Sequence, residues 1–77
     1  MPRYFFHVMD GRASLDREGV ELAGLDEVRA EAIRTAGEIL RETSGSLWSG
    51  CPWNMTVADA AGDTVFTLRF TAYEYKR

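Results

Sequence analysis

The sequence contains one cysteine, Cys51, and one histidine, His7. A single cysteine cannot form an intramolecular disulfide, which excludes a disulfide-stabilised scaffold and fits a reducing compartment. A redox dithiol would need a second cysteine, and a nucleophilic thiol needs a base, whereas His7 lies near the other end of the chain. We therefore expect Cys51 to be an inert or partly buried loop thiol, and we expect no enzymatic activity from it.

The sequence also lacks an excess of positive charge and any long apolar run. Nine Lys and Arg residues face twelve Asp and Glu residues, which gives a net charge of −3 and disfavours binding to a phosphate backbone. The apolar runs are too short to span a membrane, and the opening MPRYFFHV lacks the long apolar region and cleavage site of a signal peptide. With 45% hydrophobic residues, the chain is too apolar for disorder. We expect a globular cytoplasmic protein with no membrane contact.

Motifs that carry chemistry are missing as well. No glycine pattern resembles a phosphate loop or a dinucleotide fingerprint, and no serine lies in a nucleophile elbow. Four acidic residues surround the first predicted turn, but their spacing does not match a calcium-binding loop; they are Asp10, Asp16, Glu18 and Glu21. We expect solvated turn carboxylates there, and no catalytic residue, cofactor or metal in the chain. His7 is expected to be a surface residue or a dimer contact.

One long helix is predicted over Leu25–Thr43. Apolar residues recur on one face at helical spacing, and Ile33 extends that face sideways; the others are Leu25, Val28, Ala32, Ala36, Ile39 and Leu40. Charged residues of both signs fill the opposite face. Asp26 is placed to accept hydrogen bonds from the first-turn amides, and Thr43 to Gly45 mark the end of the helix.

Hairpins are predicted on both sides of the helix. The first strand, Arg3–Met9, ends at the turn dipeptide Asp10-Gly11 and returns over Arg12 to Leu22 as an irregular or split strand. Its Tyr4, Phe6 and Val8 alternate with Phe5, His7 and Met9, and we assign the first set to the helix side because the second contains a histidine. The last hairpin combines residues 54–59 and 64–70, and Thr71–Arg77 either extends the last strand or frays.

This order predicts one α+β domain over residues 1–77, in which a single antiparallel sheet of about four strands packs one face on one helix (ββαββ). The other face is then uncovered. We name as candidate interaction residues those expected on the uncovered face and the two tryptophans of the loop after the helix, of which at least one should cap the core: Phe5, His7, Met9, Val65, Trp48 and Trp53.

The opening MPRYFFHV, the following DG, the segment D-x-EG-x-EL over Asp16–Leu22 and the LDEVRAEA helix resemble a family of small uncharacterised proteins from rhizobia and related alphaproteobacteria. That family is classed as a domain of unknown function. The resemblance covers most of the chain, through the last strand near Phe70, and implies a cytoplasmic bacterial protein without an assigned site. A looser likeness, in layout alone, is to HicB-type antitoxins, whose N-terminal module also passes from a hairpin into a helix.

Two functions stay open from these patterns. The first is a non-catalytic protein-interaction module, acting as a homodimer or binding another protein through the open sheet face or a strand edge. A chain of this size buries only about 60% of its unfolded surface, so a partner would stabilise it. The second is a nucleic-acid-associated or antitoxin-like regulator.

Overall fold

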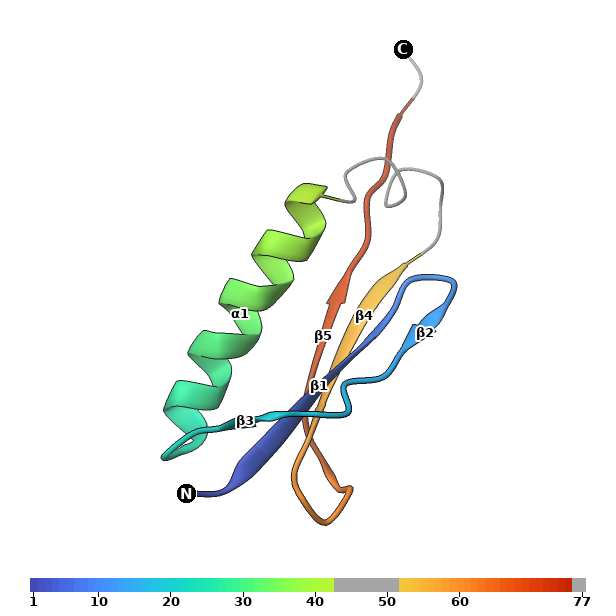
Figure 1. Cartoon of the computed structure of the whole chain (residues 1–77). Coiled ribbons are helices and arrows are strands. Elements are labelled where there is room, and N and C mark those ends of the chain that lie inside the picture. Colours follow the sequence, from blue (N-terminus) through green and yellow to red (C-terminus); the bar gives the residue numbers. More distant parts are fainter. Residues whose placement is uncertain (43–51, 76–77) are drawn as a thin grey trace.

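The structure is a computed structural model that describes residues 1–42 and 52–75. One helix packs against an open antiparallel sheet, and the order of elements confirms the expected α+β class (Figure 1). The sheet has five strands rather than about four, because the strand that returns after the first turn is split in two. The elements are β1 (Arg3–Met9), β2 (Ala13–Ser14), β3 (Val20–Glu21), α1 (Leu25–Glu42), β4 (Trp53–Ala58) and β5 (Thr64–Phe70).

The strand order places β1 and β4 in the middle of the sheet. β2 and β3 both pair antiparallel with β1, at its two ends, and β4 pairs with β1 on one side and β5 on the other. The sheet therefore has two different borders. On one side the two-residue strands lie along β1, and on the other side the seven-residue β5 is the last strand of the described sheet.

Helix α1 begins at Leu25, the first residue of the predicted segment. The backbone N–H of Val28 donates to the carbonyl of Gly24 at 3.1 Å, which makes Leu25 the first helical residue. Asp26 forms an ion pair with Arg29 at 3.3 Å, and Glu27 reaches back to accept a hydrogen bond from the Ala23 amide at 3.4 Å. The prediction that the Asp26 side chain would cap the first turn is therefore wrong, although both acidic residues still favour the positive end of the helix dipole.

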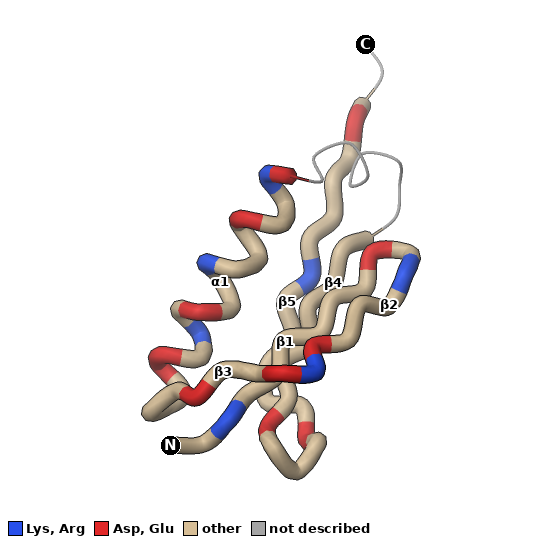
Figure 2. The backbone as a smooth tube through the Cα atoms, in the orientation of Figure 1, with Lys and Arg blue, Asp and Glu red and all other residues tan. Residues whose placement is uncertain are grey.

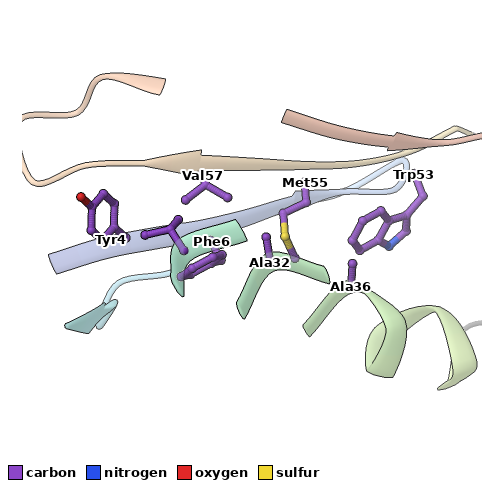
Figure 3. Packing of buried hydrophobic residues seen from close by; sticks show 8 residues of the cluster. Tyr4, Phe6, Ala32, Ala36, Trp53, Met55 and Val57 are labelled. Atoms are coloured by element: carbon purple, nitrogen blue, oxygen red, sulfur yellow. The ribbon is translucent and has the colours of Figure 1, made fainter. Parts of the chain in front are cut away.

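The core lies between α1 and the sheet (Figure 3). Alternation along β1 turns Tyr4 and Phe6 toward the helix, as expected, and the buried helix residues occupy every fourth position. The buried cluster comprises Tyr4, Phe6, Val28, Ala32, Ala36, Trp53, Met55 and Val57. The small alanines let the helix approach closest to β4, the strand that carries the fully buried Trp53, Met55 and Val57.

Several predictions concern residues at the ends of the described segments. The helix end at Thr43–Gly45, together with Trp48 and Cys51, lies outside the described residues, as does the last part of the tail. β5 ends at Phe70, and residues 71–75 continue in an extended path without strand pairing. Tyr73 and Tyr75 on this segment are exposed.

Candidate interaction surface at the edge of the sheet

The outer border of β1 is covered by residues 13–22, which we call the strap. Its central residue is Asp16, whose Oδ2 accepts the backbone N–H of Phe6 at 3.1 Å. The other oxygen of the carboxylate, Oδ1, accepts the N–H groups of Glu18 and Gly19 at 3.1 and 3.0 Å. One side chain thus takes the place of a strand partner in the gap between β2 and β3.

These contacts change the proton affinity of Asp16. Burial by itself would raise the pKa of its carboxyl, but the backbone hydrogen bonds from Gly19, Phe6 and Glu18, with a smaller contribution from His7, together bring the pKa below its ordinary value. The carboxylate is therefore ionised whenever the strap is in place at neutral pH. The expected solvated turn carboxylate is instead a structural acceptor at this position.

His7 and Gly19 complete the attachment of the strap. The Asp16 N–H donates to Nδ1 of His7 at 3.0 Å, so this nitrogen serves as an acceptor. Gly19 has a positive φ of 72°, and a Cβ there would lie 2.8 Å from the carbonyl oxygen of Tyr4. Arg3 donates to the Glu18 carbonyl at 2.7 Å and pairs with Glu21 at 3.7 Å. The sequence D-x-EG-x-EL is thus the set of residues that holds the strap on β1.

The uncovered face of the sheet carries three of the candidate residues. Phe5 and His7 stack at 6.5 Å between ring centroids and are half-buried, and Met9 is 52% exposed. Val65 lies at a β-bulge opposite Val57 and Ala58, and it packs against the buried cluster. A bulge interrupts the regular alternation of side chains, which explains why Val65 contributes to the core.

Polar side chains occupy the middle of the same face. Thr56 of β4 pairs with Thr67 of β5, and Asn54 accepts a hydrogen bond from Arg69 at 2.9 Å. These groups are satisfied in water or by each other. The uncovered face is therefore less apolar than its candidate residues suggested.

The two candidate tryptophans have different outcomes. Trp53 is 1% exposed and packs its ring against Phe70 at 5.6 Å, so it caps the core as expected of at least one tryptophan. Its burial removes it from the exposed candidate surface. Trp48 lies outside the described residues.

A more apolar feature lies between α1 and β5. A groove of about 190 Å³ is lined by residues from the flank of the helix and from the last strand: Arg29, Ala32, Ile33, Phe66, Thr67 and Leu68. Ile33 is 62% exposed at its rim, although the apolar periodicity indicated a core-facing residue. The guanidinium of Arg29 lies over the ring of Phe66 at 5.2 Å from the centroid. We call this feature, together with the outer border of β5, the β5 edge.

The backbone of β5 adds directional groups to this groove. In the part of the chain that the structure describes, β5 pairs only with β4, so its outer border presents N–H and C=O groups without a strand partner. Such a border is a template for another strand. The candidate residues chosen from sequence missed this surface, since Ile33 extends the apolar face of the helix, and Phe66 and Leu68 do not share the uncovered face to which Val65 was assigned.

The part of the chain that the structure describes has no basic stripe. Arg residues are interspersed with Asp and Glu along α1 and around the strap (Figure 2). Among the described residues, no group of three His, Cys, Asp or Glu side chains is placed to hold a metal ion. No described helix has the length and apolar character needed to cross a membrane.

These features define a small α+β domain with a helix on one face of an open antiparallel sheet. A family model described as "Domain of unknown function (DUF6894)" matches residues 3–71, and the chain belongs to this family. This confirms the expected membership in a family of unknown function, while the bacterial group stays a prediction. No curated protein and no solved structure matched the chain.

Proposed function

We propose that the chain is a non-catalytic protein-interaction module whose binding element is the β5 edge. The observation that carries the proposal is the coincidence of two features on one border. An unpaired strand offers backbone hydrogen bonds, and the adjoining groove offers apolar contacts from Ile33, Phe66 and Leu68. Main-chain pairing supplies affinity and side-chain contacts supply specificity in recognition by strand addition.

The use of the titratable residues supports a non-catalytic role. His7 and Asp16 are neighbours, which is where acid–base chemistry would be sought. Both are occupied by backbone hydrogen bonds that hold the strap. The hydrogen bonds of His7 and Asp16 therefore support a structural role for both side chains.

The alternative, a nucleic-acid-associated or antitoxin-like regulator, has weaker support. Arg3, Arg29 and Arg34 each pair with an acidic neighbour, so their charge is partly neutralised within the chain. Binding through phosphates would weaken steeply with added salt. Titration with DNA and RNA at several salt concentrations tests this alternative, and strong salt-sensitive binding would favour it over the proposal.

Site-specific photo-crosslinking in cells tests the proposed function. A photoreactive amino acid replaces Ile33 at the β5 edge or, as a matched control, Leu15 on the strap; both residues are 62% exposed. The proposal predicts discrete protein adducts from position 33 and none of matching yield from position 15. Equal labelling at the two positions, or no adduct at position 33, would contradict it.

A further inference from the structure

We propose that the partner of the β5 edge is a second copy of this chain, joined by antiparallel pairing of the two β5 strands about a two-fold axis at Thr67. This inference rests on the proposed function and specifies its partner. The two sheets then form one continuous sheet across the axis, with both helices on the same face. Such a contact uses the same surface on both copies, as closed dimers do.

The length of β5 selects the register. With the axis at Thr67, the two seven-residue strands overlap over their whole length, and Thr64 of one copy lies opposite Phe70 of the other. The bulge at Val65 interrupts the regular ladder near each end of this overlap. Any other centre shortens the overlap. In this register Phe66 of one copy lies opposite Leu68 of the second, and Thr67 lies opposite itself. Apolar pairs and threonine pairs are both favourable across antiparallel strands.

The β5 edge carries little uncompensated charge, which favours contact with a second copy at this border over contact elsewhere on the molecule. The chain carries a net charge of −3, so two copies repel each other except where their charges are neutralised. Of the six residues that line the groove, Arg29 alone is charged, and it pairs with Asp26. Arg69 is the single charge on β5, and the register places it opposite Val65 of the second copy, away from the second Arg69.

The placement of α1 explains the exposed Ile33. The helix approaches β4 most closely and leaves the last strand partly uncovered. Strands lie about 4.8 Å apart, so a helix over β4 would stand about 7 Å from the axis and the two helices about 14 Å from each other. Direct helix packing needs about 8–10 Å. Large side chains must therefore fill the space, and Ile33, Phe66 and Leu68 of both copies are those that line it.

The two borders of the sheet differ in how well they are protected against pairing with a strand of another chain. Exposed edges are usually shortened, covered or charged to prevent pairing with another chain. The β1 border has this protection, because its partner strands have two residues each and Asp16 fills the gap between them. β5 has seven residues, no proline or glycine and one charge.

Disulfide trapping tests the register. Cys51→Ser combined with Thr67→Cys places two thiols opposite each other at the axis, where Cα separations of about 4.5–5.5 Å suit a disulfide. The matched control combines Cys51→Ser with Thr64→Cys, whose thiols would lie about 20 Å apart along the paired strands. We expect rapid formation of a covalent dimer from the first variant, at least tenfold faster than from the second. Equal rates, or faster trapping of the control, would overturn the register.

Sedimentation equilibrium of the unaltered chain gives an independent readout that does not depend on the folding of a variant. We expect a dimer at micromolar concentrations, and a monomer up to high micromolar concentrations would overturn the inference. If the chain is monomeric while position 33 still yields an adduct with a different protein, the second-copy inference fails and the proposed function stands. If position 33 yields no adduct at all, the proposed function itself fails.

Discussion

The two borders of the sheet differ in what pairs with their outer backbone N–H and C=O groups. The β1 border satisfies its backbone groups within the chain, through β2, β3 and the Asp16 carboxylate. In the described sheet, the β5 border leaves its outer backbone groups without a strand partner and has an apolar groove beside them. If the proposed interaction holds, stability and recognition are assigned to different borders of this small domain. Changes to the strap should alter folding, and changes to the β5 edge should alter association.

The largest effect on stability is expected from Gly19→Ala. Its Cβ would lie 2.8 Å from the Tyr4 carbonyl oxygen at a φ of 72°, so both steric overlap and the left-handed backbone oppose the change. We expect a loss of about 3 kcal/mol in the free energy of unfolding, measured by urea denaturation. The control is Gly62→Ala, which has a similarly positive φ of 91° but open space around the Cβ. An equal loss of stability for both variants would show that the close contact between Gly19 and the Tyr4 carbonyl oxygen does not contribute to the loss.

Asp16→Ala should lower stability somewhat less. The change removes the acceptor of three backbone N–H groups, of which the Phe6 amide lies inside the sheet. We expect a loss of about 2 kcal/mol at neutral pH, measured by the same denaturation.

The pH dependence of that loss gives a second check. Because the pKa of Asp16 is lower in the folded chain than in the unfolded chain, its stabilising contribution is fully present above the unfolded pKa of about 3.9. The contribution disappears as the pH falls through the folded pKa. The stability difference between the wild type and Asp16→Ala should therefore shrink below about pH 4. A difference that stays constant down to strongly acidic pH would contradict the role of the carboxylate.

Thr67→Lys should act on association rather than on folding. The exposed Thr67 lies at the proposed axis, so the substitution would set two ammonium groups opposite each other. We expect a rise of about tenfold in the dimer dissociation constant, because like charges directly opposite destabilise strand pairing by up to about 1 kcal/mol for each pair and the strand also loses its threonine pair. Analytical ultracentrifugation measures the constant, with Thr64→Lys as the control at the end of β5. A dimer that Thr67→Lys leaves unchanged would place the interface elsewhere.

The smallest effect is expected from removing one apolar side chain at the groove. Ile33→Ser takes away a side chain that is 62% exposed in the single chain and buried in the proposed dimer. The dissociation constant should rise by a factor of about 5–10, the equivalent of about 1 kcal/mol of apolar burial. Leu15→Ser on the strap, at the same exposure, should leave it unchanged. Equal effects of the two changes would indicate unspecific hydrophobic association.

The sequence indicated the fold more fully than the surface. Alternation in Tyr4, Phe6 and Val8 and the four-residue spacing of Val28, Ala32 and Ala36 predicted which sides meet in the core. These signals are local, so they can be read without knowing the strand order. The same reading assigned Ile33 to the core, because periodicity shows that a helix flank is apolar but not what covers it.

Other features depended on contacts between distant parts of the chain. The sequence predicted an irregular or split returning strand but not what fills the gap, because nothing in the local sequence of Asp16 requires its side chain to replace ladder hydrogen bonds to β1. β5 is an edge because β4 pairs with β1 on its other side, which is a matter of topology. The bulge that directs Val65 to the core arises from a register shift between β4 and β5. The candidate surface accordingly moved from the open face to the edge.

Amide hydrogen exchange as a function of protein concentration tests the contrast between the two borders most directly. The strap satisfies its backbone groups within one chain, so exchange in residues 13–22 should not depend on concentration. Outer amides of residues 64–70 should become protected as the concentration rises, in step with dimer formation. Protection of β5 that stays the same from low to high micromolar concentrations, in a chain that remains monomeric, would contradict the account.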